Sequence, residues 1–148
     1  MMFQGGDFSV ADVAGRVLEK LLGIFYDLEE EGGTSGRPDC FLLKVRGLPW
    51  QRFFFDAGIV FWGEYELEEL EEDLESRSID YVQTYLLDGR TVESAVCEDR
   101  EDLPGTLNVT ISLDDGTDFV AYVVDPADLD SEVDIKVIKR VPRDVSPA

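Results

Sequence analysis

The sequence predicts an α+β fold: an antiparallel sheet of about six or seven strands, largely hairpin-connected, with an N-terminal helix and a short acidic helix. Three observations predict it: an amphipathic stripe near the N-terminus, short strand-like apolar runs after it, and Asp-Gly turn signals between runs. Because most connections are short, an antiparallel meander is favoured over a βαβ arrangement. The 148 residues fit a single acidic domain, 1–148, with 142–148 expected to be a flexible tail.

The first expected element is an N-terminal helix that begins after Ser9. Ser9 can cap it, and Asp12 three residues later completes an approximate capping box. Gly23 is suited to end it. Apolar residues recur at the spacing of one helical stripe: Val10, Val13, Ala14, Val17, Leu18, Leu21 and Leu22.

Strands are expected after the glycine-rich segment 29–38, which reads as a surface loop. The first half of the chain has strand-like runs at 40–45, 50–55 and 59–62. The three consecutive phenylalanines 53–55 place aromatic rings on both faces of their strand. This strand is therefore expected to be covered on both sides.

The second half of the chain is predicted to be rich in β-hairpins. Segments 79–87 and 91–97 flank Asp88-Gly89, and segments 107–113 and 118–124 flank a second Asp-Gly turn. The last strand is expected over 135–141, after an acidic loop.

The acidic residues are concentrated in the middle of the chain. The chain has 33 Asp and Glu residues and 13 Lys and Arg residues, which gives a net charge of −20. In the segment 64–75 eight of twelve residues are carboxylates, while Leu67, Leu70 and Leu74 predict a helix with one narrow apolar stripe. An irregular acidic loop is the competing interpretation. The basic residues lie near the two chain ends, where they could form one face of the fold.

Most catalytic chemistry finds no support in the residue types present. Because the chain has no histidine, Ser-His-Asp and Cys-His arrangements are excluded, and no catalytic residue, cofactor or resident metal is expected. The glycine-rich segment 32–36 lacks the lysine of a phosphate-binding loop. The acidic segment 125–134 superficially suits a hard cation, but it lacks the central glycine and distal glutamate of an EF-hand. A solvated loop is the favoured interpretation.

The two cysteines, Cys40 and Cys97, lie beside strand-like runs and are expected to be buried, reduced thiols. No export signal is recognisable, and no apolar run approaches the ~18 to 20 residues needed to span a bilayer. A cytoplasmic location is therefore expected.

A partner-binding surface is the functional interpretation of the acidic centre, which a cluster of aromatic residues precedes. The expected contact residues combine exposed rings with carboxylates: Trp62, Glu64, Tyr65, Glu68, Glu69, Glu71 and Glu72. Such a surface favours a basic protein partner, whereas direct binding to nucleic acid or to a membrane is disfavoured by the negative charge. The simpler alternative is that the acids only solvate the surface and the aromatics fill the core.

In composition the chain is similar to bacterial immunity proteins, which are small acidic proteins that neutralise toxins. This similarity implies a non-enzymatic protein-binding module of the immunity or inhibitor type. Two alternatives remain open: a DNA-mimic inhibitor of a nucleic-acid-binding protein, and a homo-oligomer subunit whose hairpin edges pair with those of its copies.

Overall fold

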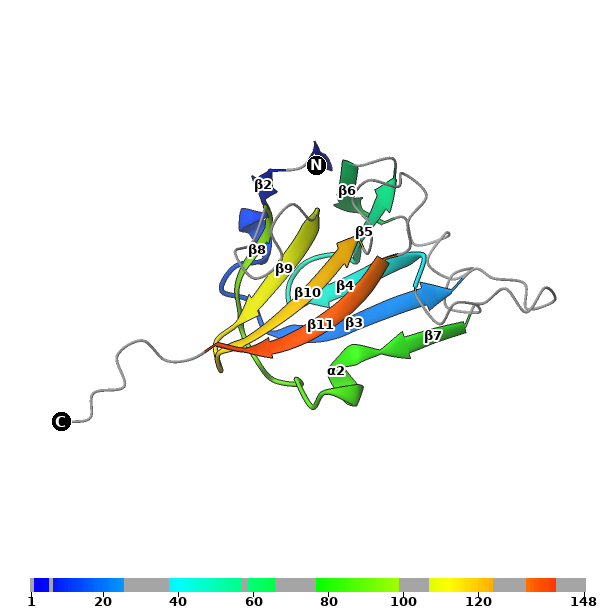
Figure 1. Ribbon diagram of the computed structural model, residues 1–148. Helices are drawn as coiled ribbons and strands as arrows, with labels where there is room; N and C mark the ends of the chain where they lie inside the picture. The colour runs from blue at the N-terminus through cyan, green and yellow to red at the C-terminus, as the bar shows by residue number, and fades with distance from the viewer. Residues whose placement is uncertain are drawn as a thin grey trace.

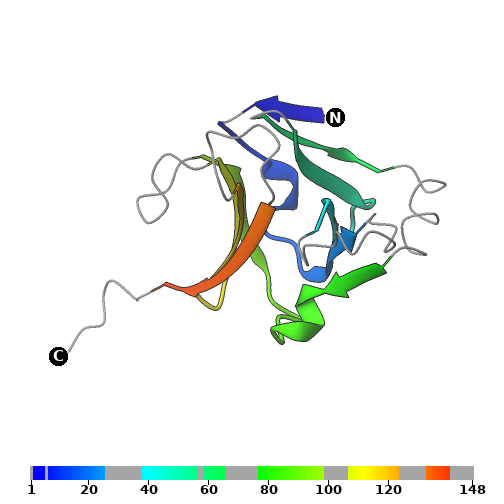
Figure 2. The same cartoon turned by 45° about the vertical axis from the view of Figure 1, so that its right-hand side comes forward.

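Two antiparallel β-sheets pack against each other in the computed structural model, which describes residues 2–5, 7–25, 38–56, 59–65, 77–98, 107–123 and 133–140 (Figures 1 and 2). Within these residues, sheet A has the strand order β1-β6-β5-β4-β3-β7 and sheet B the order β11-β10-β9-β8-β2. The strands of sheet A are β1 Met2–Gly5, β3 Leu18–Phe25, β4 Cys40–Val45, β5 Gln51–Asp56, β6 Ile59–Glu64 and β7 Arg77–Asp80. Those of sheet B are β2 Phe8–Ser9, β8 Val92–Cys97, β9 Asn108–Leu113, β10 Thr117–Val123 and β11 Val133–Lys139.

The main core lies between the inner faces of the two sheets. On sheet A the rings of Phe41, Phe53 and Trp62 stack along the cross-strand direction, with centroids 4.8 and 4.6 Å apart. Phe119 on β10 meets Phe41 edge to face at 6.3 Å and so joins the two sheets. These large rings bury much apolar surface, and their burial supplies a major part of the driving force for folding.

Sheet A is also apolar on its outer face, the face directed away from sheet B. A second cluster of buried side chains lies there: Leu22, Ile24, Cys40, Leu42 and Tyr65. On β4 both faces are therefore buried, and on β5 Phe53 faces the core while Phe54 lies on the opposite face. The expectation that the triple phenylalanine would place rings on both faces of its strand is confirmed.

The predicted N-terminal helix is wrong, and the single sheet of about six or seven strands is instead two sheets of six and five strands within the described residues. Over the residues of the predicted helix the chain forms β2, a short 3-10 helix Ala11–Val13 and the long strand β3. A β-bulge between Leu18 and Lys20 adds one residue to β3, so the inward-facing Leu18 and Leu21 are three positions apart. This three-residue spacing is also the spacing of apolar residues on one side of a helix. Gly15, with φ of +82°, interrupts the predicted apolar stripe.

The first predicted hairpin, around Asp88-Gly89, is also wrong. The turn exists, with Gly89 at φ +80°, but the two segments beside it do not pair. β7 ends at Asp80, whose carboxylate accepts the Val82 N–H and caps the helix α2, Tyr81–Thr84. β7 pairs with β3, while β8 pairs with β9.

The second predicted hairpin is confirmed as β9 and β10, joined through a turn at Asp114 and Asp115. The strands expected at 40–45, 50–55, 59–62 and 135–141 are present as β4, β5, β6 and β11, with shifts of one or two residues at several ends. The expected acidic helix beyond Tyr65, most of the loop 29–38, the acidic loop up to residue 132 and the tail 142–148 lie outside the described residues.

Basic residues from distant parts of the chain meet at one end of the sheets, where each has a polar partner. Arg16 donates to the carbonyl of Arg46, and the Arg140 guanidinium pairs with Glu93 at 3.2 Å and with Asp118 at 3.0 Å. Acidic residues therefore mix with the basic ones, and this end does not form a purely basic face.

Cys40 and Cys97 are buried, one in each sheet, and neither forms a disulfide. In the described part of the chain, no helix has the length and apolar character needed to cross a membrane.

Candidate functional site

The negative charge is divided unevenly between the β-sheets and the rest of the chain. The described residues include 14 acidic and 10 basic side chains, a balance of −4. The other residues contribute 19 acidic and 3 basic side chains, and so carry −16 of the total of −20. The described residues are thus close to neutral, and most of the negative charge belongs to the remainder of the sequence.

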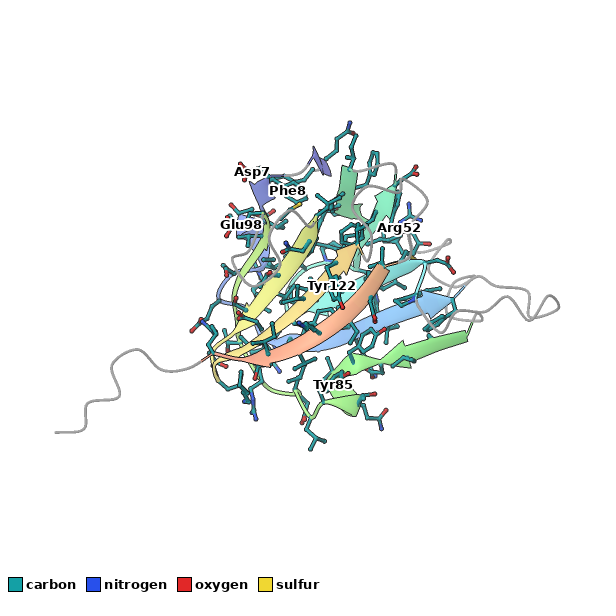
Figure 3. The ribbon with its side chains drawn as sticks, in the orientation of Figure 1. Asp7, Phe8, Arg52, Tyr85, Glu98 and Tyr122 are labelled. Atoms are coloured by element: carbon teal, nitrogen blue, oxygen red, sulfur yellow. The ribbon has the colours of Figure 1, made fainter. Side chains whose placement is uncertain are left out.

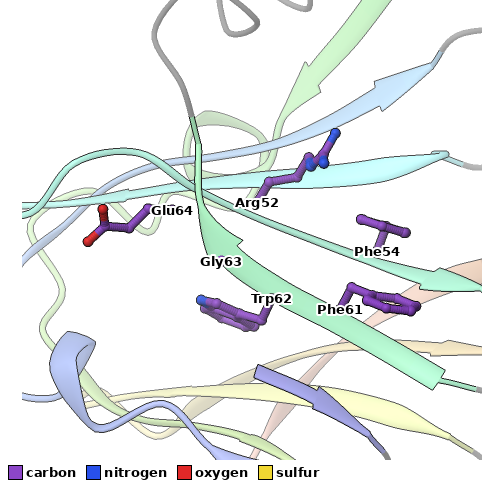
Figure 4. Close-up of a pocket in the computed structure, with 6 residues that line it drawn as sticks. All are labelled: Arg52, Phe54, Phe61, Trp62, Gly63 and Glu64. Atoms are coloured by element: carbon purple, nitrogen blue, oxygen red, sulfur yellow. The ribbon is translucent and has the colours of Figure 1, made fainter. Parts of the chain in front are cut away.

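A hollow lies on the outer face of sheet A, at the point where β5 and β6 run side by side (Figure 4). Its volume is about 100 Å³, and we call it the aromatic hollow. The residues that line it are Arg52, Phe54, Phe61, Trp62, Gly63 and Glu64.

The sheet register explains why the hollow forms here. Phe54 lies directly opposite Phe61, and their rings stack at 5.1 Å. Arg52 lies opposite Gly63 in the same way. Because glycine has no side chain, the space beside Phe61 on this face stays open, and the surface of the sheet is exposed there.

The Arg52 guanidinium lies over two aromatic rings. The guanidinium carbon lies 5.0 Å from the centroid of Phe54 and 4.7 Å from that of Tyr65. Contacts of this kind stabilise the cation while leaving its edge N–H groups available to an acceptor. The hollow therefore offers an apolar surface with one positive charge, and exposed Glu64 borders it.

The structure separates the predicted contact residues. Trp62 is only 2% exposed: its ring lies in the main core, and its indole N–H donates to Gln51 Oε1 at 2.6 Å. The expectation that this ring is partly exposed is wrong, because the alternation of β6 turns Trp62 inward. Tyr65 belongs to the buried outer cluster and Glu64 is exposed. The four glutamates at positions 68, 69, 71 and 72 lie outside the described residues.

Arg52, Phe54 and Phe61 were not among the predicted contact residues. The sequence signal that identifies these residues is the alternation of side-chain direction along a strand. Positions 52 and 54 share one face of a strand, and so do 61 and 63. Once the two segments are recognised as a hairpin, a single register places all four side by side.

Comparison of this chain with family models, curated proteins and solved structures finds no match. The features that bear on function are therefore the two-sheet antiparallel fold, the aromatic hollow and the distribution of charge.

Proposed function

We propose that this protein is a non-enzymatic binding module of the immunity or inhibitor type, which captures a basic, amphipathic segment of a partner protein. The observation that supports it most is the division of charge, −4 in the described residues and −16 in the others. The longest acidic run, 66–75, begins directly after Tyr65, where the chain leaves the aromatic hollow. Apolar and acidic contact elements are therefore neighbours in the sequence.

The two elements contribute differently to binding. Carboxylates attract a basic partner over distances of about a Debye length, ~8 Å at physiological salt, and so raise the rate of encounter. The hollow supplies the apolar contact, because Phe54 and Phe61 are only partly buried and a side chain of the partner can cover them.

Arg52 adds a requirement on the partner. Its guanidinium lies beside the hollow, where a second basic side chain is disfavoured and a carbonyl or carboxylate acceptor is favoured. The preferred segment therefore presents an apolar side chain and an acceptor to the hollow, with its basic residues directed toward the acidic run.

A cytoplasmic location belongs to the same proposal. It is supported by Cys40 and Cys97, which are buried in different sheets and form no disulfide, so that the fold needs no oxidising compartment.

The test uses a synthetic peptide of alternating leucine and lysine, with a peptide of alternating leucine and glutamate as its negative control. The fourfold variant Glu68→Gln, Glu69→Gln, Glu71→Gln, Glu72→Gln is compared with a matched variant, Asp7→Asn, Asp12→Asn, Asp88→Asn, Glu98→Gln. Both change the net charge equally, and the matched positions are exposed and lie outside β3 to β6.

Fluorescence anisotropy then gives the dissociation constant of each variant at the same ionic strength. The proposal predicts that the fourfold variant binds the basic peptide about tenfold more weakly, and the matched variant less than about threefold more weakly. Equal effects of the two variants would show that net charge alone attracts the peptide, and the docking role of the acidic run would be abandoned.

A further inference from the structure

The strand β11 forms one outer edge of sheet B, and it differs from the other edge strands in length (Figures 1 and 2). It has seven residues, whereas β1 and β7 have four each and β2 has two. Short edge strands discourage pairing between molecules, while a long edge presents a continuous row of N–H and C=O groups. Among the described residues, no strand pairs with the outer side of β11.

The hydrogen-bond pattern shows which residues direct their backbone groups to this free edge. The Arg140 N–H donates to the Gly116 carbonyl, in line with the β10–β11 ladder. Because the direction alternates along an antiparallel strand, Asp134, Lys136 and Ile138 share that orientation. The backbone groups of Val133, Ile135, Val137 and Lys139 then point outward.

The Ile135 N–H supports this assignment independently. It donates to Asp134 Oδ1 at 2.8 Å. A side chain thus occupies a backbone donor that a further strand would otherwise use. A local bond of this kind can be exchanged for a backbone acceptor when such a strand arrives.

We propose that β11 pairs with β11 of a second copy of this chain, antiparallel and centred on Ile135, so that the two copies form one continuous sheet. This inference is independent of the proposed capture of a basic partner. In this register Ile135 lies opposite Ile135 of the second copy, and Val133 lies opposite Val137. These are the residues whose backbone groups point outward, so each pair exchanges two hydrogen bonds.

The same register also matches the charges on the strand. Asp134 lies opposite Lys136 of the second copy, and twofold symmetry repeats that pair. Both are non-hydrogen-bonded positions, where the Cα atoms of opposite residues approach most closely, at about 4.5 Å. Shifting the centre to residue 136 would instead set Lys136 against Lys136, which is destabilising. Charge therefore favours the register centred on Ile135 over the one centred on residue 136.

In this arrangement the inner faces of the two copies also lie on the same side of the joined sheet. Ile135 and Val137 are partly buried against the main core, and centring on Ile135 keeps both copies' apolar positions on one side of the joined sheet. Centring on residue 136 would keep them on one side as well, so charge and not side-chain direction distinguishes these two registers.

Sedimentation equilibrium of the full chain, at about 0.15 M salt so that the charge of −20 on each copy is screened, measures this association. The weight-average mass is expected to rise from 16.6 kDa toward twice that value between about 10 µM and 1 mM. A mass that stays at 16.6 kDa throughout would overturn the proposal.

Charge reversal then tests the register. Lys136→Glu and Asp134→Lys are each expected to weaken the dimer about tenfold, because each replaces two attractive pairs by two repulsive ones. The double variant Asp134→Lys, Lys136→Asp restores opposite charges and should restore the dimer. Lys44→Glu, on sheet A, makes the same change of charge as Lys136→Glu and should leave association unchanged.

A dimer that responds equally to Lys136→Glu and Lys44→Glu, or that the double variant fails to restore, would contradict the proposed register. Ile135→Pro gives a second test that does not depend on charge. It removes an N–H that the β10 ladder does not use, so the fold should persist while the dimer is lost. Near-ultraviolet circular dichroism checks the fold of each variant.

Discussion

Gly23 and Tyr81 show how a single residue without a side chain determines the packing of the core. A Cβ on Gly23 would lie 2.5 Å from Tyr81 Oη and 2.9 Å from Tyr81 Cε2. The Tyr81 ring cannot easily move away, because it lies between Phe119 at 5.1 Å and Tyr85 at 6.3 Å. Gly23 is therefore a packing requirement and not the helix terminator that the sequence suggested.

Gly23→Ala is expected to lower the free energy of unfolding by about 1 to 3 kcal/mol through overpacking. Removing the hydroxyl in Gly23→Ala, Tyr81→Phe should recover part of that loss relative to Gly23→Ala alone. Urea denaturation of the single and double variants measures both effects. A Gly23→Ala protein as stable as the wild type would show that the ring moves aside freely.

Tyr81 also links stability to alkaline pH. Burial raises the pKa of its hydroxyl well above the ordinary value near 10, and the neighbouring Tyr85 and Asp134 raise it further. The folded state therefore holds the Tyr81 proton at pH values where the unfolded chain releases it. This stabilising contribution is fully present below about pH 10 and is lost as the pH rises above that value.

The free energy of unfolding should consequently fall less steeply above about pH 10 in Tyr81→Phe than in the wild type. Urea denaturation at a series of pH values from about 8 to 11 measures the two slopes. Parallel curves for the two proteins would contradict the account of Tyr81.

At the scale of the elements, the β9–β10 turn can be predicted from the sequence because residues close together in the chain determine it. Asp115 accepts the Thr117 N–H at 3.0 Å and pairs with Arg90 at 2.8 Å and with Lys139 at 3.5 Å. Burial alone would raise the pKa of Asp115, but the bonds from Arg90 and Thr117 outweigh it and hold the pKa well below its usual range. The carboxylate thus joins the turn to two other parts of the sheet end.

Asp115→Ala should lower the free energy of unfolding by about 1 to 2 kcal/mol at neutral pH, and Asp115→Asn by less, because the amide oxygen can still accept the Thr117 N–H. Since the folded-state pKa is depressed, the stabilisation is present above about pH 4 and is lost as the pH falls further. Thermal unfolding at several pH values checks this, and a difference between Asp115→Ala and wild type that persists unchanged at low pH would refute it.

The elements that the sequence did not predict depend on non-local contacts. Seven of the expected strands appear, as β4, β5, β6, β8, β9, β10 and β11, because alternation and turn residues are local signals. A helix is predicted at the N-terminus because a bulge in β3 gives its apolar residues a helical spacing. The predicted hairpin of β7 and β8 does not form because β7 pairs with β3 instead. The hollow required the β5–β6 register, which no single segment contains.

For the whole molecule, the uneven charge predicts opposite effects of salt on folding and on binding. Self-repulsion at a net charge of −20 opposes the compact state, and salt screens it. Raising the salt from about 10 to 150 mM should therefore raise Tm by about 2 to 5 °C, while it weakens binding of the basic peptide. Calorimetry and anisotropy on the same samples measure the pair, and a Tm that falls with added salt would contradict this distribution of repulsive charge.

The proposed capture of a basic, amphipathic partner is tested most directly by nuclear magnetic resonance of the protein titrated with the leucine–lysine peptide. The largest chemical-shift changes in the described strands should fall on the outer face of sheet A, at Arg52, Phe54, Phe61 and Gly63. The side chains near the β2–β8 edge, where Figure 3 shows Asp7, Phe8 and Glu98, should change little. Changes confined to sheet B, or none at peptide saturation, would contradict the assignment of the aromatic hollow as the binding site.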